Sequence, residues 1–168
     1  MPETISIAPE APQHDDDIES IHAEAFGPGR YARAAFRVRE GGPHDRDLSF
    51  VALKDGNAIA SVRLTPILVG NSPGLLLGPL AVRPAFKNLG WGRKLMVRAL
   101  EAAHAHGHGL VILVGDRPYY EPFGFRVVPA GRIAMPGPVD PNRLLALELQ
   151  PGSFENVQGT VRWGRQAA

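Results

Sequence analysis

The most constraining feature of the sequence is an apolar segment that leads through a proline-marked loop and a glycine pair into an amphipathic helix. This stretch runs from Leu80 to Met96. The first turn of a helix leaves backbone N–H groups without partners and carries the positive end of the helix dipole. Gly90 and Gly92 would let an anion approach the main chain closely. The stretch therefore predicts a site for a phosphorylated cofactor, with nearby cations at Lys87, Arg93 and Lys94.

The overall composition is that of an ordinary globular chain. The 168 residues are 44% hydrophobic and 21% charged, with a formal net charge of +1, which suits one domain over residues 1–168. This balance gives no electrostatic reason to expect nucleic acid or an anionic membrane as a partner. The absence of cysteine excludes disulfides and thiolate catalysis. No stretch reads as a transmembrane or targeting segment, so we expect a cytoplasmic protein.

Hydrophobic spacing and turn signals predict an α+β fold. The turn from Lys54 to Asn57 is a strong hairpin signal, and a helix from Gly90 to about His106 separates two later apolar strands. This order favours a central mixed, mostly antiparallel sheet flanked by helices. The predicted strands are Ile5 to Ile7, Leu48 to Leu53, Ala58 to Leu68, Leu75 to Val82, Leu110 to Val114, Phe125 to Val128, Leu144 to Leu149 and Val157 to Trp163. The other helical segments are one after Asp15 to Asp17 that ends at Phe26 to Arg30, one from Tyr31 to Arg39, and a turn from Asp116 to Glu121 capped by Asp116.

Three local patterns have structural explanations. Pro79 lies inside an apolar strand and cannot donate to a ladder, which predicts a bulge or a local edge. The acidic run Asp15 to Asp17 fits the cap and first turn of a helix, because we find no further oxygen ligands for a metal nearby. The histidines His104, His106 and His108 fall across a helix end and cannot share one face. We therefore predict no metal site.

Two motifs in the chain resemble the GNAT superfamily of acetyl-CoA-dependent N-acyltransferases. The first is Lys87-Asn-Leu-Gly90-Trp-Gly92, which is similar to the family signature Arg/Gln-x-x-Gly-x-Gly/Ala. The second, Tyr119-Tyr-Glu-Pro-Phe-Gly-Phe125, is similar to the later motif Tyr-x-x-x-Gly-Phe. Together with Leu77 to Val82, these residues are most similar to the bacterial YhbS-like branch. The resemblance implies a three-layer fold and the transfer of an acetyl group from acetyl-CoA to an amine.

Elementary chemistry gives this region definite roles. Pyrophosphate would lie on the N–H groups of Asn88 to Arg93, and the strand backbone at Leu80 to Val82 would pair with the pantetheine amides and stabilise an oxyanion. By motif alignment Tyr120, four residues before Gly124, is the acid that protonates the departing thiolate, with Tyr119 as the alternative. The expected cofactor-binding residues are Leu80, Ala81, Val82, Lys87, Asn88, Leu89, Gly90, Trp91, Gly92 and Arg93.

The sequence departs from the family pattern at the catalytic base. Many members carry a glutamate in the central strands, but this chain has no acidic residue between Gly56 and Glu101. The base is therefore unassigned, with Glu24 and His22 as guesses. The acceptor, a small-molecule or peptide amine, is expected near the first two helices and beside the late strands. The residues expected around it are Phe26, Arg30 and Tyr31.

Two other functions fit part of the pattern. Gly90 and Gly92, with Asp116 after the next strand, imitate a dinucleotide fingerprint. However, Leu95 stands at the third glycine position and a loop intervenes before the helix. A module that binds acetyl-CoA without chemistry is the second alternative, because the usual acidic base is missing. The sequence leaves a monomer and a homodimer both open.

Overall fold

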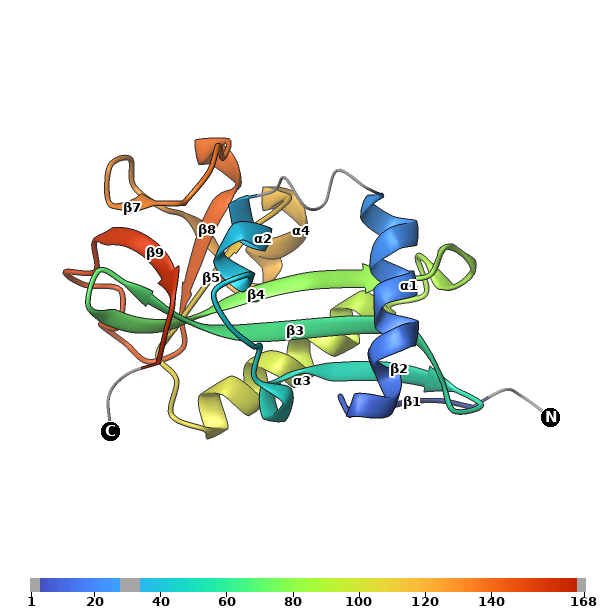
Figure 1. The fold of residues 1–168 in the computed structure, drawn as a ribbon. Helices are drawn as coiled ribbons and strands as arrows, with labels where there is room; N and C mark the ends of the chain where they lie inside the picture. Colours follow the sequence, from blue (N-terminus) through green and yellow to red (C-terminus); the bar gives the residue numbers. More distant parts are fainter. Residues whose placement is uncertain (1–3, 28–33, 166–168) are drawn as a thin grey trace.

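The computed structural model describes residues 4–27 and 34–165, which build one sheet covered by helices (Figure 1). The predicted alternating and apolar runs form its strands, and the segments with helical spacing form its helices. The strands are β1 (Ile5–Pro9), β2 (Phe50–Lys54), β3 (Asn57–Val69), β4 (Ser72–Val82), β5 (Leu110–Val114), β6 (Arg126–Val127), β7 (Ile133–Ala134), β8 (Leu144–Glu148) and β9 (Gly159–Trp163). The helices are α1 (Asp15–Phe26), α2 (Ala34–Arg39), α3 (Trp91–Ala105) and α4 (Arg117–Tyr120).

The sheet is mixed and mostly antiparallel, as predicted. Hydrogen-bonded neighbours follow the order β1-β2-β3-β4-β5-β8-β6, while β9 pairs with β3 and β7 pairs with β9. The pairs β4–β5 and β7–β9 are parallel, and the remaining pairs are antiparallel. The crossover between β4 and β5 is made by α3. This arrangement places the start of α3 at the end of β4, next to the parallel pair.

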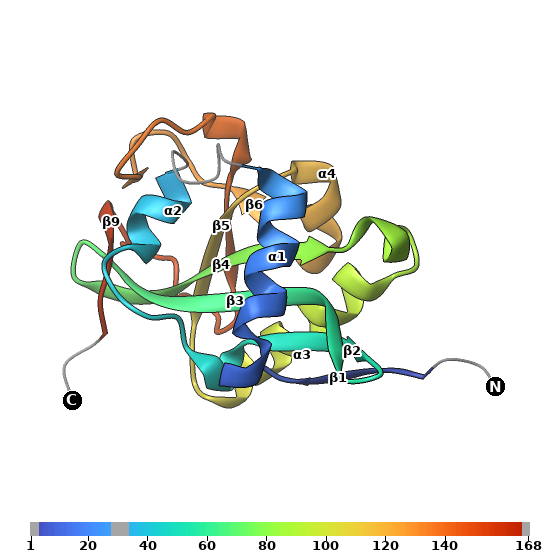
Figure 2. The same cartoon turned by 45° about the vertical axis from the view of Figure 1, so that its right-hand side comes forward.

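Alternate residues of the strands supply apolar layers on the two faces of the sheet. On β4, Leu75 and Leu77 pack with Leu95 of α3, whereas Leu76 between them packs with Val38 of α2. Ile18 of α1 is buried in a further cluster. Figures 1 and 2 show α1 and α2 on one face of the sheet and α3 on the other. The period of two along each strand thus produces the three layers.

β4 contains the bulge that Pro79 predicts. Its register with β3 jumps from Leu77 opposite Leu64 to Leu80 opposite Val62, so Gly78 and Pro79 together face one residue of β3. β4 pairs with β5 only at Leu75 and Leu76. Past that point the two parallel strands carry no further ladder pair within the described part of the chain. Beyond Leu76 the backbone of β4 is therefore open on the side away from β3.

Several predicted boundaries are wrong by a few residues. β2 begins at Phe50 because residues 46–48 form a 3-10 turn, in which Asp45 accepts from the N–H of Asp47. β4 begins before Pro73, which is tolerated because β5 joins only at Leu75. The side chain of Asp116 makes no capping hydrogen bond. β6 and β9 are shorter than predicted, and the strand β7 was not predicted. The start expected for α2 at residues 31–33 lies outside the described residues.

Helix α1 carries the acidic run in its first turn, with His14 as the residue before it. α3 ends before Gly107, so that His104 lies in the helix and His106 and His108 lie beyond it. Among the helices of residues 4–27 and 34–165, none is long and apolar enough to cross a membrane.

Candidate active site

A cavity of about 830 Å³ opens where β4 separates from β5. One wall is the bulged part of β4, from Leu77 to Leu80, and a second wall is formed by residues 114–116 and the tyrosines of α4. Side chains of α1 and α2 form the opposite wall. The loop before β8 closes one side through residues 138–143, whereas no residue of β8 or β9 is among those that line the cavity. Two separating strands and two helices therefore create a site large enough for a small substrate.

The start of α3 has the properties of an anion site. Gly90 is its N-cap with a φ of 90°, and no side chain caps the helix. The first helical hydrogen bond runs from the N–H of Lys94 to the carbonyl of Gly90 at 3.1 Å. Among the described groups outside α3, none accepts from the N–H groups of residues 88–93. These donors and the positive end of the helix dipole suit a phosphate group.

Cations surround the start of α3, as the sequence suggested. The guanidinium of Arg93 lies over the ring of Phe123 at 5.5 Å, and the ammonium of Lys94 lies over the ring of Trp91 at 4.4 Å. Lys87 is exposed in the preceding loop. Trp91 itself is partly buried against the main core. Stacking on aromatic rings holds the two α3 cations close to the exposed amides.

The two tyrosines of α4 both line the cavity but differ in their surroundings. Tyr119 is 42% exposed, and a Cβ placed on Gly92 would lie 2.8 Å from its hydroxyl. The ring of Tyr120 packs edge-on against Tyr119 and Phe125, with centroids 4.8 and 6.0 Å away. The backbone of Gly115 leaves room for that ring, because a Cβ there would lie 2.5 Å from it.

Burial keeps both phenols protonated. Loss of solvent, with a smaller contribution from the neighbouring Tyr119, raises the pKa of Tyr120 to about 12, against the opposing effect of Arg143. Burial also raises the pKa of Tyr119, while Arg93 opposes the rise. A phenol with a raised pKa is neutral at physiological pH and can donate a proton. The cavity therefore has a proton donor at the point where β4 and β5 separate.

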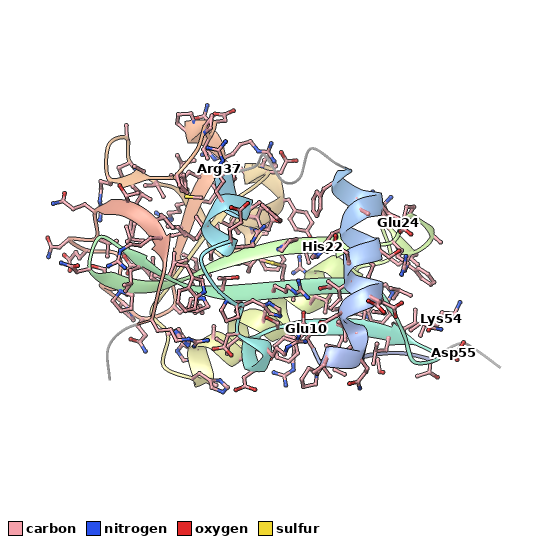
Figure 3. All side chains as sticks on the ribbon, in the orientation of Figure 1. Glu10, His22, Glu24, Arg37, Lys54 and Asp55 are labelled. Atoms are coloured by element: carbon pink, nitrogen blue, oxygen red, sulfur yellow. The ribbon has the colours of Figure 1, made fainter. Side chains whose placement is uncertain are left out.

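The two guessed bases lie on opposite sides of α1 (Figure 3). His22 is buried and lines the cavity. Glu24 instead accepts from Arg83 at 2.7 Å and is not among the residues that line the cavity. Phe26 does line it, whereas Arg30 and Tyr31 lie outside the described residues.

Sequence reasoning missed a charged cluster beside the cavity. The side chain of Glu10, labelled in Figure 3, is fully buried. It accepts from Arg63 Nε at 2.6 Å and from Arg46 at 3.1 Å, and it also contacts His44 Nε2. Both His44 and Arg63 line the cavity. The available signal was Arg63, the one charged residue in the run Ala58 to Leu68, but its partners are distant in sequence.

The cluster keeps Glu10 ionised. Burial by itself raises the pKa of Glu10, but hydrogen bonds from His44 and Arg63 outweigh burial and hold this pKa below its ordinary value. Asp15 at the start of α1 takes two hydrogen bonds from Arg46, at 3.1 and 3.0 Å. That pairing lowers the pKa of Asp15. Two carboxylates and two guanidiniums thus form one network beside the cavity, which Arg63 lines.

Comparison with known proteins gives consistent results. Residues 45–127 match the family model described as an acetyltransferase (GNAT) domain. The uncharacterized N-acetyltransferase YhbS of Escherichia coli (strain K12) is 25% identical over 157 residues, which cover 92% of this chain and 93% of that protein. YjhQ of the same strain, also an uncharacterized N-acetyltransferase, is 29% identical over 126 residues, or 73% of this chain and 69% of that protein.

Solved structures share the fold. The E. coli YhbS structure in complex with CoA has a TM-score of 0.81 at 24% identity, covering 99% of this chain and 93% of that chain. A GNAT family acetyltransferase from Brucella melitensis in complex with acetyl-CoA has a TM-score of 0.71 at 25% identity, covering 98% of each chain. The fold, a mixed and mostly antiparallel sheet flanked by helices, is thus shared with these proteins.

Proposed function

The chain is an N-acetyltransferase of the GNAT superfamily, and we propose that it transfers the acetyl group of acetyl-CoA to an amine by direct attack in a ternary complex. The observation that carries this proposal is the opening between β4 and β5 beside the uncapped start of α3. That opening joins the start of α3, a strand edge without a ladder partner and a cavity with a proton donor. Each part suits one portion of acetyl-CoA and its reaction.

The start of α3 would hold the pyrophosphate of acetyl-CoA. The backbone N–H groups of residues 88–93 would donate to it, and Lys87 would add charge from the loop. Leu89 is 61% exposed and Trp91 partly buried, so these two would contribute backbone N–H groups. The positive φ values of Asn88 and Gly90, 62° and 90°, support a loop that turns its amides toward a ligand.

The open edge of β4 would hold the pantetheine arm. Leu80, Ala81 and Val82 pair with β3 on one side only, so their free backbone groups can bond the pantetheine amides as an added strand would. One of these donors would also face the thioester carbonyl and stabilise the oxyanion formed on attack. The bulge at Gly78 and Pro79 supports this role because it separates β4 from β5 at this point.

Tyr120 would act as the general acid. After the amine attacks the thioester carbon, the C–S bond breaks and the CoA thiolate takes the phenolic proton. A pKa of about 12 keeps that proton on Tyr120 at neutral pH. The sequence has no cysteine to carry an acyl group, which supports direct attack rather than a thioester on the enzyme.

The proposal extends to the organisation of the protein. Residues 1–168 would act as one domain, because one sheet joins the described apolar clusters. The acceptor would be a small-molecule or peptide amine that enters through the cavity. A cytoplasmic location stays a prediction, and a monomer and a homodimer stay alternatives that sedimentation would separate.

The test is a panel of amines, amino acids and peptides, assayed for CoA release from acetyl-CoA. We expect at least one acceptor to release CoA well above the rate of acetyl-CoA hydrolysis without acceptor. Calorimetry should show CoA binding far more tightly than NADH. The reverse ranking would contradict the cofactor, and tight CoA binding without turnover on any acceptor would indicate a binding module.

A further inference from the structure

The charged cluster beside the cavity is balanced without a charge on its histidine. Glu10 and Asp15 carry two negative charges, and Arg46 and Arg63 carry two positive charges. They come from the end of β1, the start of α1, a 3-10 turn and β3. His44 joins this network as a fifth member through Glu10. The charges of the network therefore cancel when the imidazole of His44 is neutral. When the imidazole is protonated, the carboxylate of Glu10 can stabilise its positive charge.

Glu10 also fixes which ring nitrogen of His44 can act. An ionised carboxylate only accepts, so Nε2 must carry the proton in its contact with Glu10. In the neutral ring the lone pair is then on Nδ1. Within the described part of the chain, Nδ1 makes no hydrogen bond. The side chain of His44 is 17% exposed and lines the cavity, so substrate or water can reach it.

The cluster adjoins the part of the cavity where acetyl transfer is proposed. Arg63 is the residue of β3 that faces the bulge of β4, between the pairs Val62–Leu80 and Leu64–Leu77. Arg63 also lines the cavity together with Gly78, Pro79 and Tyr120. Its bond to Glu10 thus links His44 to the strand edge proposed for the thioester.

We propose that His44, oriented by Glu10, is the general base that this chain uses in place of the missing strand glutamate. The inference rests on the proposed function. The acceptor ammonium gives one proton to Nδ1 of His44, directly or through one water, and the resulting imidazolium is paired with Glu10. The neutral amine then attacks the thioester carbon, forming the C–N bond and breaking the C–S bond.

The remaining protons balance without another reactant. The thiolate takes the proton of Tyr120, and the second proton of the amine nitrogen restores the phenol through solvent. His44 releases its proton to bulk water before the next turnover. The net reaction yields an amide, CoA and one proton. In this scheme Glu10 is a positioning residue, because it acts through His44.

Other titratable and charged groups face the same cavity and must be separated from His44. His22 is a second imidazole on the wall, and it comes from α1. It contacts the ring of Phe26, with centroids 6.2 Å apart, whereas His44 contacts the carboxylate of Glu10. His22→Gln is therefore the matched control for His44→Gln. The remaining charged groups on the walls are Glu19, Arg39, Asp116, Asp140 and Arg143.

The first experiment measures kcat/KM against pH for wild type, His44→Gln and His22→Gln, using the fastest acceptor of the amine panel. Loss of a general base should lower the His44→Gln rate by about 10²–10⁴-fold at neutral pH. The deficit should shrink as pH rises, because more amine is already neutral in solution. Acetyl-CoA affinity, measured by calorimetry, should not change. His22→Gln, whatever its effect on the rate, should keep the acidic limb of the profile.

The Glu10→Gln variant tests whether Glu10 acts on His44 through its charge or only through packing. It retains the shape of the side chain but removes the charge that stabilises the imidazolium, so the acidic limb of the profile should move to lower pH. A His44→Gln loss that is constant with pH, or a wild-type rate when chemistry is rate-limiting, would overturn the proposal. So would a profile in which His22→Gln, rather than His44→Gln, removed the acidic limb.

A second measurement needs no acceptor and keeps the two proposals distinguishable. The ¹⁵N shifts of the His44 ring, assigned with His44→Gln, report its protonation state. We expect the neutral ring to carry its proton on Nε2 and to leave Nδ1 free. An imidazolium that persists at the pH at which the enzyme is active, or the opposite tautomer, would overturn the base assignment. Failure of the whole amine panel would instead count against the proposed function.

Discussion

Tyr120 is the residue proposed to supply a proton where β4 and β5 separate. Tyr120→Phe keeps the ring and its packing against Phe125 but removes the phenolic proton. We expect kcat to fall by about 10²-fold, the lower end of what acid–base groups typically contribute, since water can partly substitute. Acetyl-CoA affinity should change little. Tyr119→Phe is the matched control and should be milder. A Tyr120→Phe enzyme at the wild-type rate, with chemistry rate-limiting, would leave this residue a packing role only.

The raised pKa of Tyr120 also predicts how kcat depends on pH. Tyr120 keeps its proton below a pKa of about 12, so its ionisation should not lower kcat between neutral pH and moderately alkaline pH. An alkaline fall in kcat that Tyr120→Phe abolishes would contradict this expectation.

Gly92 is the residue whose substitution should damage the anion site most. Gly92→Asp places a negative charge among the first amides of α3, and its Cβ would also meet the Tyr119 hydroxyl at 2.8 Å. We expect acetyl-CoA affinity to fall at least ~10-fold, or about 1.4 kcal/mol, in a protein that still folds. Gly92→Ala adds the same Cβ without the carboxylate and should lose less. If calorimetry shows that folded Gly92→Asp binds acetyl-CoA as tightly as wild type, pyrophosphate does not lie at the start of α3.

The helix α3 is held in place by its apolar face, apart from the role proposed for its start in binding pyrophosphate. Leu95 is fully buried against the sheet, whereas Val97 on the same helix is 41% exposed. Leu95→Ala should reduce the free energy of unfolding by about 2–5 kcal/mol, and Val97→Ala by about 0.5 kcal/mol or less. Urea denaturation of both variants measures the difference. Equal losses would mean that α3 is not anchored by this face.

Elements with strong local signals could be predicted from the sequence. The glycine pair, the apolar face of α3 and the hairpin at Asp55 and Gly56 each depend on residues close together in the chain, and α3 and the hairpin appear where they were expected. The bulge at Pro79 followed from its missing N–H. The short strands β6 and β7 could not be located in this way, because two residues carry no periodicity. The base proposed above could not be predicted either, because the cluster that orients it joins Glu10 to Arg63, 53 positions apart in the sequence.

The molecule as a whole should lose stability in acid, because the buried carboxylate of Glu10 bonds groups from several elements and must be ionised to do so. Hydrogen bonds from His44 and Arg63 outweigh burial and hold the pKa of Glu10 below 4.5, its ordinary value. The folded state thus binds its proton more weakly than the unfolded chain, so this stabilisation is present above pH 4.5 and is lost as pH falls through the folded pKa. Urea midpoints should drop below about pH 4.5 and depend less on pH in Glu10→Gln.

Glu10→Gln itself should cost about 1.5–3 kcal/mol at neutral pH, since Arg63 and Arg46 lose hydrogen bonds to a buried charged group although Asp15 still pairs with both. Glu101→Gln, an exposed change on α3, is the control and should keep both the stability and its acid dependence. An acid dependence that is identical in Glu10→Gln and wild type would show that the cluster does not join β1, α1 and β3 energetically.

The central claim is that acetyl passes directly from acetyl-CoA to an amine while both are bound. Initial rates measured with both substrates varied, using acetyl-CoA labelled in its acetyl group, test it most directly. We predict intersecting double-reciprocal lines and the label in an amide product. Parallel lines would indicate an acyl-enzyme, and label found only in free acetate would show that no acetyl transfer to the amine takes place.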